Sequence, residues 1–470
     1  MSTIPSVLQV ILLIFAVVMS FNLIIFVHEL GHFLAAKWRG LRIDRFQIWF
    51  GTPIWKKEIN GVQYGLGWIP AGGFVALPQM APMEALEGGS KDDKPLPPIT
   101  PLDKIIVAFA GPLFSMLLAL VSAVFVWQIG KPADFIATTQ VGFLIPDSPA
   151  QKAGLLIGDK IIAINGVKVT GFAGSLDSVT ENIVLSRGKE ISYTVEREGA
   201  SEPITLRSGF ETEKTQWFQR GGLRQVGIMP AGNAIVGKVS PNSPAADAGI
   251  TAGDKILSVD GFKLYSLQQF SQYLRDQKWK TVRLGLQTAA GGTRDVEVTP
   301  ERPLKPSGFD PMVGIQWGDG GEVDTRIVHP GPIRQVTVSL KMMWTTITSV
   351  MASDSSIGVG HLSGPVGIAK LQYQLLQMDD GWRRILAFMV LFNVNLAVLN
   401  MMPFPVLDGG HITLAVLEKI FGRPVKAKPL EILQTLCALA LISLMLFVTS
   451  KDIGDSFGRA KEKNEEIVFP

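Results

Sequence analysis

The chain has 470 residues, of which 47% are apolar and only 18% are charged, against about 25% charged in a typical soluble protein. This composition excludes a disordered chain and argues against an ordinary cytosolic enzyme. A net charge of +3 is too small to indicate nucleic-acid binding. The single cysteine, Cys437, excludes an intrachain disulfide and a cysteine-cluster metal site. We therefore expect apolar blocks that alternate with ordinary soluble sequence.

Four apolar runs are long enough to cross a bilayer, which requires about 20 apolar residues. The first lacks a basic leader and a small-residue cleavage site, so we interpret it as a retained span rather than a signal peptide. A buried core helix is the alternative for any single run, but four runs together favour a multi-pass α-helical membrane protein with four transmembrane helices. The runs cover residues 1–27, 105–130, 385–407 and 432–450.

The motif HELGH occupies residues 28–32, near the end of the first run. Side chains four residues apart share a helix face, so His28 and His32 can reach one ion. In this pattern two neutral histidines ligate Zn²⁺ and the glutamate, here Glu29, is the base for a bound water. Solvated histidines outside the membrane are the alternative. Lys37, however, follows His28 by about 14 Å along a helix, which favours a motif within the bilayer, where ionisable residues indicate function.

Residues 41–78 contain short strand-like runs separated by glycines. A free strand edge in this segment could hold an unwound substrate as an added strand. A plain cytoplasmic hairpin is the alternative.

Residues 131–382 have soluble character and contain a duplication. Segments 148–169 and 243–264 are identical at 11 of 22 positions, with an offset of 95 residues. The shared pattern resembles PDZ domains, in the form found in bacterial membrane-associated proteases. PDZ domains bind extended peptides at a sheet edge, so peptide ligands are expected, and spacers or plugs are the alternative. Further on, residues 331–353 have helical periodicity, which suits an interfacial helix, a clamp on the PDZ pair or an ordinary packing helix.

The third run ends in the sequence NLAVLNMMPFPVLDGGH at residues 395–411. Pro403 and Pro405 predict a break in the helix. Because spans one and three cross in the same direction, Asp408 should reach the same side of the membrane as His28. We predict Asp408 as the third metal ligand; a turn-capping aspartate is the alternative, and His411 is the rival ligand.

Basic residues follow the first span at 37–57 and lie between the third and fourth spans at 419–428. Their excess predicts that both segments are cytoplasmic. Arg383 and Arg384, and the charged tail after Ser450, disagree with this orientation, although long outer segments translocate regardless of charge. The PDZ-like block is then on the outer side, where it could exclude substrates with bulky outer domains.

These motifs together resemble the site-2 protease family of intramembrane zinc metalloproteases, in the bacterial form with tandem PDZ domains. Further segments fit the family: residues 70–74 resemble its membrane-associated β-loop, residues 111–112 lie in its second span, and residues 363–367 precede its third. The resemblance implies one Zn²⁺ on His28, His32 and Asp408, with Glu29 as the catalytic base. The substrate-binding residues implied or expected are Asn400, Asn395, Gly72, Gly73, Pro403 and Pro405.

The resemblance also implies a bacterial inner-membrane protein that cuts single-pass membrane proteins after their outer domain has been removed. Substrates of the family include an anti-sigma factor of the envelope-stress response and remnant signal peptides; membrane lipid and PDZ peptide ligands complete the expected partners. A PDZ-bearing scaffold with a vestigial metal site is one alternative. A metal transporter is another, but spans two and four offer almost no polar residues.

The domain organisation predicted from these features places the catalytic motif and the PDZ pair in separate parts of the chain. The segments are the first transmembrane helix with HExxH (1–36), a basic segment with a membrane-associated β-loop (37–103), the second helix (104–130), two tandem PDZ-like α/β domains (131–222 and 223–303), a connecting strand with amphipathic helices (304–382), the third helix (383–407), a cytoplasmic-side loop (408–430), the fourth helix (431–450) and a tail (451–470).

Overall fold

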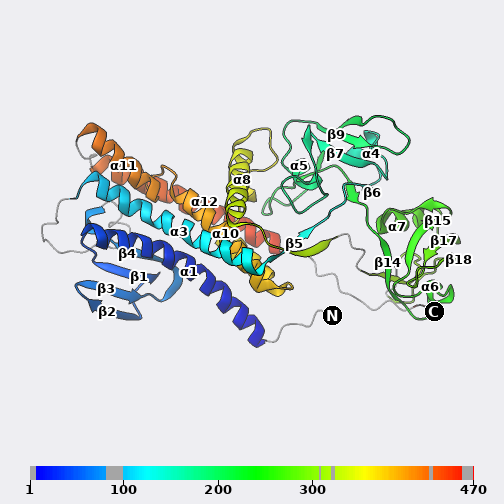
Figure 1. Cartoon of the computed structure of the whole chain (residues 1–470), viewed down its shortest axis with the longest axis horizontal. Coiled ribbons are helices and arrows are strands. Elements are labelled where there is room, and N and C mark those ends of the chain that lie inside the picture. Colours follow the sequence, from blue (N-terminus) through cyan, green and yellow to red (C-terminus); the bar gives the residue numbers. More distant parts are fainter. Residues whose placement is uncertain are drawn as a thin grey trace. The chain divides into compact units, whose positions relative to one another are not determined.

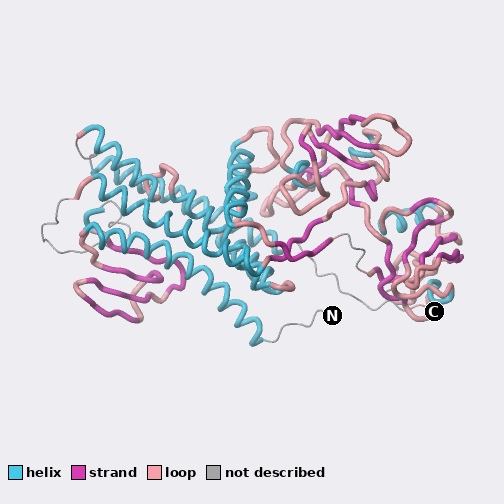
Figure 2. The backbone as a smooth tube through the Cα atoms, viewed as in Figure 1, coloured by secondary structure: helices cyan, strands magenta, loops and turns pink. Residues whose placement is uncertain are grey.

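The computed structural model describes residues 7–80, 99–305, 308–318, 323–422, 427–457 and 469. The chain forms two compact units (Figure 1). The first contains residues 1–132, 327–347 and 362–453, and the second contains residues 133–326, 348–361 and 454–470. Figure 2 shows long helices in the first unit and mainly strands and loops in the second.

Four of the described helices are long and apolar enough to cross a membrane, judged by length and composition, as the sequence predicts. Helix α3 packs against both α1 and α10. Large apolar side chains along α1 and α12 are exposed, as expected of surfaces that face lipid. The four helices are α1 (Val7–Arg39), α3 (Pro101–Ile129), α10 (Gly381–Asn400) and α12 (Ala427–Phe457).

A four-stranded sheet follows α1 and packs against it. The strand order is β2-β3-β1-β4, with β1 parallel to β3 and antiparallel to β4, so β4 is an edge strand. Phe33 of α1 is buried against Phe46 and Val75 of the sheet. The elements are β1 (Arg45–Phe50), β2 (Trp55–Ile59), β3 (Val62–Leu66), β4 (Ile69–Ala76) and the short helix η1 (Pro78–Met80).

The described residues of the first unit also form three shorter helices, α8 (Pro332–Met351), α9 (Pro365–Gln377) and α11 (Asp408–Phe421). The last residues of α8, from Thr348 on, belong to the second unit. Helix α8 agrees with the periodicity of residues 331–353. Helix α11 differs from the loop predicted at 408–430. Its sequence has ordinary helix signals that explain the difference: Asp408 in the first turn, Lys419 in the last, and Gly422 with φ +66° after its end. The third span also ends at Asn400, before the prolines, rather than at residue 407.

The second unit contains two halves with separate hydrophobic cores. The repeated segments fold into equivalent elements, helix α4 with strands β7 and β8 in one half and helix α6 with β15 and β16 in the other. The first half comprises β6 (Val141–Leu144), α4 (Pro149–Lys152), β7 (Lys160–Ile164), β8 (Val167–Lys168), α5 (Val179–Val184), β9 (Ile191–Glu196), β10 (Ile204–Ser208), β11 (Glu211–Thr212), β12 (Arg224–Gln225) and β13 (Ile228–Pro230). The second half comprises β14 (Ala234–Val239), α6 (Pro244–Asp247), β15 (Lys255–Val259), β16 (Phe262–Lys263), α7 (Leu267–Asp276), β17 (Val282–Gln287), β18 (Thr293–Val298) and β19 (Ile315–Trp317).

In each repeat, the aspartate of the Gly-Asp step stabilises a turn by accepting a hydrogen bond from a backbone amide. Asp159 accepts a hydrogen bond from the Leu156 amide at 2.9 Å and pairs with Arg197 at 2.7 Å. Asp254 accepts from the Thr251 amide at 3.0 Å. Both carboxylates are buried, so their hydrogen bonds are costly to lose.

The halves end later than the sequence predicted. Strand β13 pairs with β6, so the first half extends beyond residue 222 to Pro230. Strand β19 pairs with β14, and Val313 lies in the second core, so the second half extends beyond residue 303 to Trp317. In both halves the closing strand is too short and irregular to be recognised by alternation alone. Strands β5 (Lys131–Phe135) and β20 (Asp324–Val328) border the two halves and pair with each other.

Candidate metal centre

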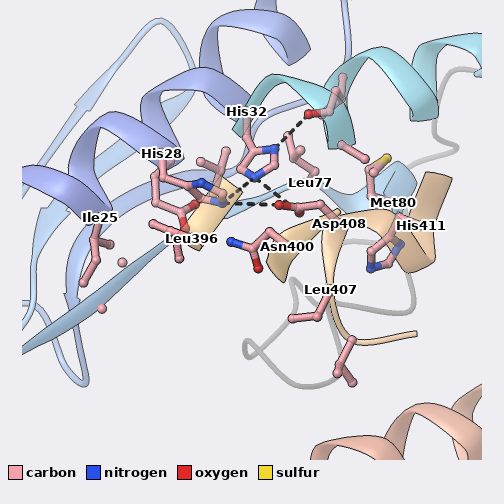
Figure 3. Close-up of a pocket in the computed structure, with 17 residues that line it drawn as sticks. Ile25, His28, His32, Leu77, Met80, Leu396, Asn400, Leu407, Asp408 and His411 are labelled. Atoms are coloured by element: carbon pink, nitrogen blue, oxygen red, sulfur yellow. Dashed lines mark hydrogen bonds and ion pairs between the residues drawn. The ribbon is translucent and has the colours of Figure 1, made fainter. Parts of the chain in front are cut away.

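Two histidines one turn apart on α1 direct their imidazoles toward one carboxylate (Figure 3). The Nε2 atoms of His28 and His32 are 3.3 Å apart. Asp408 places one carboxylate oxygen 3.3 Å from His28 Nε2 and the other 3.4 Å from His32 Nε2. One potential ligand atom from each side chain lies within 4.8 Å of the others, in a cluster that could hold a metal ion. All three side chains are almost fully buried.

The second nitrogen of each imidazole contacts α3. His32 Nδ1 lies 2.8 Å from the carbonyl oxygen of Val107, which can only accept a hydrogen bond. His28 Nδ1 lies 2.9 Å from the hydroxyl of Ser115. A proton on each Nδ1 leaves the Nε2 lone pairs directed at the shared space. This is the usual second contact of a metal-binding histidine.

A glycine allows α3 to approach this closely. A Cβ atom on Gly111 would overlap His32 Nε2 and lie 2.9 Å from His28 Nε2. Gly111 therefore leaves the space that the two imidazoles and an ion require.

Asp408 reaches the histidines because the chain turns sharply between α10 and α11. The turn is compact: a Cβ on Gly409 would overlap the Met401 carbonyl, and a Cβ on Gly410 would overlap that of Phe404. The two glycines thus pack the first turn of α11 against the turn that precedes it. The Asp-Gly-Gly sequence combines a ligand with the small residues that position it.

A cavity of about 290 Å³ adjoins the three side chains. Its wall includes Glu29, one residue after His28, and Asn400 at the end of α10. Gly72 and Gly73 of the edge strand β4 also line it. The full lining is Ile25, His28, Glu29, His32, Gly72, Gly73, Val75, Leu77, Met80, Val107, Ala108, Leu396, Asn400, Val406, Leu407, Asp408 and His411.

Not every residue singled out in the sequence reaches this cavity. Asn395, Pro403 and Pro405 are not among its lining residues. The carbonyl of Pro405 instead accepts a hydrogen bond from Gln434 of α12 at 3.2 Å. His411, the rival ligand, lines the cavity but is outside the cluster formed by His28, His32 and Asp408.

Comparison with known proteins identifies the family. Residues 15–444 match the sequence profile of peptidase family M50. The chain belongs to this family. A protein of Neisseria meningitidis, named as a candidate zinc metalloprotease, is 27% identical over 92% of this chain and 96% of its own length. The regulator of sigma-E protease RseP of Salmonella typhimurium is 28% identical over the same shares, and that of Escherichia coli is 27% identical over 91% of this chain and 95% of its own length.

Among solved structures, the PDZ domain of an SdrC-like protein from Listeria monocytogenes matches at 26% identity with a TM-score of 0.17. The match covers 21% of this chain and 98% of that domain.

The donor set of this M50 peptidase fits zinc. Two imidazole nitrogens and one carboxylate are a common ligand set for catalytic zinc, which keeps a fourth position open for water. The cavity beside the cluster provides room for that position. The buried Nε2 atoms also face each other at 3.3 Å, an arrangement that a shared cation stabilises.

Sequence reasoning missed the roles of three parts of the M50 site, although it had matched residues 111–112 to the second span of the family. Ser115 and the Val107 carbonyl hold the imidazoles, and Gly111 leaves space for them. Gly111 and Ser115 are four residues apart on the second span, and this small-residue spacing was the available signal. The Val107 contact involves a backbone atom, so no sequence pattern can reveal it.

Proposed function

We propose that this M50 peptidase is an intramembrane zinc metalloendopeptidase of the site-2 protease type. The observation that carries the proposal is the cluster of His28, His32 and Asp408 beside Glu29. The histidines lie on the apolar helix α1, and Asp408 begins α11, which follows the apolar helix α10. Ionisable groups in such helices are retained for function. The substrates are single-pass membrane proteins whose outer domain has already been removed, as with an anti-sigma factor, and remnant signal peptides.

In this proposal His28 and His32 hold zinc through Nε2 and Asp408 through a carboxylate oxygen. Zinc, when bound, supplies a Lewis acid and a water with a pKa of about 7. Glu29 takes a proton from the attacking water and delivers it to the amine of the departing peptide, as a general base and then a general acid. Ser115 and the Val107 carbonyl keep the imidazoles oriented during this exchange.

Substrate positioning is assigned to β4 and to the end of α10. A transmembrane helix hydrogen-bonds its amides internally, so the bond to be cut must first be unwound. Strand β4 pairs on one side with β1, and Gly72 and Gly73 line the cavity. An unwound segment can add to the other edge as an antiparallel or parallel strand. Asn400 lies in the same wall and can bond the substrate backbone. Asn395, Pro403 and Pro405 would act only indirectly, by shaping the end of α10.

The proposed topology places the protein in the bacterial inner membrane. The basic segments after the first span and between the third and fourth spans are cytoplasmic, with the active site near that side. The two halves of the second unit are PDZ-like domains on the periplasmic side, and residues 70–74, within the segment 37–103, belong to a membrane-associated β-loop. The PDZ pair then either binds peptides or excludes substrates that still carry an outer domain.

Substitution of Glu29 tests the function directly. We expect Glu29→Gln to lower cleavage of a trimmed membrane substrate by at least about 100-fold, because it removes the base. Zinc content, measured by mass spectrometry, should stay near that of the wild type. Glu58→Gln on the exposed strand β2 is the matched control and should cleave normally. Undiminished cleavage by the Glu29 variant would refute the assignment.

A further inference from the structure

A second cavity, of about 600 Å³, lies in the first unit between α8, the end of α3 and the beginning of α10. Helix α8 stands beside these helix ends (Figure 1). Gln335 of α8 fixes this arrangement because its Nε2 donates to the carbonyl oxygens of Ala123, at 2.9 Å, and Pro330, at 2.7 Å. Ala123 and Val126 of α3 also pack against Val390 of α10. The walls of the cavity are therefore packed elements rather than a loose surface.

The rim of this cavity is basic. Lys131, Arg334 and Arg384 line it together with His329, and none of the described residues that line it is acidic. Lys131 is half-buried, its ammonium group forms no hydrogen bond or ion pair with the described residues, and burial lowers the pKa of that group. The Arg334 side chain likewise has no partner among the residues described. The neighbouring turn carries two acidic residues, and neither lines the cavity. Asp380 pairs with Arg383 at 3.8 Å, and Arg384 Nε donates a hydrogen bond to the backbone carbonyl of Asp379 at 3.1 Å.

These basic residues mark one end of the helix bundle. Lys131 comes two residues after α3, and Arg384 lies in the first turn of α10. Because the last turns of α3 pack on the first turns of α10, both residues lie where the apolar helices end. Arg334 occupies the first turn of α8. Lys131 and Arg384 are half-buried and Arg334 is exposed at the edge, so like charges gather beside apolar walls, an arrangement that an anion stabilises.

The deeper wall is apolar. It is formed by Phe388 and Leu391 of the spanning helix α10 and by Val338 and Met342 of α8. Val338 and Met342 remain 42% and 40% exposed, so α8 presents apolar surface that protein does not cover, and Phe388 and Leu391 of α10 are half-buried. A basic rim above apolar walls matches a molecule with an anionic head and hydrocarbon chains.

We propose that this cavity binds the phosphate of an anionic membrane phospholipid, whose acyl chains lie along α10 and α8. The proposal also explains Arg384, which opposes the orientation predicted from the other basic residues. A basic residue at that end binds the lipid headgroup and does not mark the cytoplasmic side of the membrane. The shared chemistry is a phosphate, so free phosphate and a lipid phosphate must be distinguished by experiment.

The test is lipid binding by the purified full-length protein in detergent. Increasing amounts of dioleoylphosphatidylglycerol or dioleoylphosphatidylcholine are added, and bound lipid is counted by native mass spectrometry. We expect the wild type to prefer the anionic lipid. Removing one basic residue should weaken that binding about 5-fold, and Lys131→Gln with Arg384→Gln should weaken it roughly 30-fold. The matched control, Lys189→Gln with Lys280→Gln, removes two exposed charges from the second unit and should bind as the wild type does.

Two further measurements keep the test decisive. Arg334→Gln changes an exposed side chain, so it reports on the site if the double variant fails to fold; we expect about 5-fold weaker binding. Millimolar inorganic phosphate should not displace the lipid, because it lacks acyl chains. The proposal would be overturned if phosphate displaced the lipid completely. It would also be overturned if an acidic peptide, and not the lipid, saturated the site. An unchanged lipid preference in both variants would do the same.

Discussion

At the scale of single residues, Gly111 determines how closely α3 can approach the imidazole pair. An added methyl group would overlap His32 Nε2, and the helix backbone cannot withdraw without losing the contacts of Val107 and Ser115. We expect Gly111→Ala to weaken zinc binding by at least about tenfold, as removal of an outer contact of a ligand does. Zinc affinity is measured by competition with a chelator. Gly331→Ala, where a Cβ meets no atom within 4 Å, is the control and should bind zinc normally. Equal affinities in the two variants would contradict the steric argument.

Ser115 acts on the imidazole pair of His28 and His32 through a hydrogen bond, whereas Gly111 acts sterically. Ser115→Ala removes the oxygen that faces His28 Nδ1, so this imidazole is free to adopt the other tautomer or to rotate. We expect zinc affinity to fall about tenfold and Ser115→Thr to restore part of it. Ser122→Ala removes a buried hydroxyl from the same helix, away from the ligands, and should leave zinc affinity unchanged. If Ser122→Ala has the same effect as Ser115→Ala, the loss is one of helix packing.

At the scale of elements, the sequence predicted best what depends on periodicity and prolines. The histidines at four-residue spacing lie on one face of α1, and the break near Pro403 and Pro405 brings Asp408 to them. Helix α11 was predicted as a loop because its Asp-Gly-Gly start resembles a turn. Contacts between distant segments, such as His28 with Ser115, could not be predicted, because the small-residue spacing of Gly111 and Ser115 marks a close-packing face but does not say which helix packs there.

Strand β4 depends on a glycine with an unusual backbone conformation. Gly72 has φ +78°, and a Cβ there would overlap the ring of Phe50 on β1. Gly61 has a similar φ of +80° but open space around it. We expect Gly61→Ala to cost about 1 kcal/mol, and Gly72→Ala about 1–3 kcal/mol more because of the overlap. Thermal unfolding and substrate cleavage measure both. Cleavage lost in the Gly72 variant and regained with Phe50→Ala would support the role of this edge, whereas equal costs at both glycines would refute it.

Helix α9 takes its N-terminal cap from another helix. The buried carboxylate of Asp452 on α12 accepts hydrogen bonds from the amides of Gly364, at 3.0 Å, and Gly367, at 2.8 Å. Gly364 precedes α9 and has no side chain to cap it. Asp452→Asn removes the negative charge at the positive end of the helix dipole, so we expect a loss of about 1 kcal/mol. Thermal unfolding measures the loss. Glu431→Gln on an exposed position of α12 is the control, and an equal shift in both variants would contradict the capping role.

At the scale of the whole molecule, the metal centre and the block of two small domains are formed by different parts of the chain. The two hydrophobic cores of this block, with the side chains packed against them, lie within residues 136–317 and share no residue with the metal centre. The bordering strands β5 and β20 pair with each other, so the block leaves and rejoins the chain at neighbouring points. Removal of the block should therefore leave the metal centre intact.

This arrangement makes the proposed size filter testable by deletion. We expect a variant without residues 136–318, joined by a short glycine-serine linker, to cleave a substrate that still carries its outer domain at least about tenfold faster than the full chain does. Such a change corresponds to about 1.4 kcal/mol of lost discrimination. Cleavage of a trimmed substrate is the internal control, and it should change little because the ligands and Glu29 remain. The deletion ends beyond residue 303 because Val313 and β19 belong to the second core and would otherwise be exposed. If both substrates keep their original ratio of rates, the domains bind peptides or serve another role, and the filter is excluded.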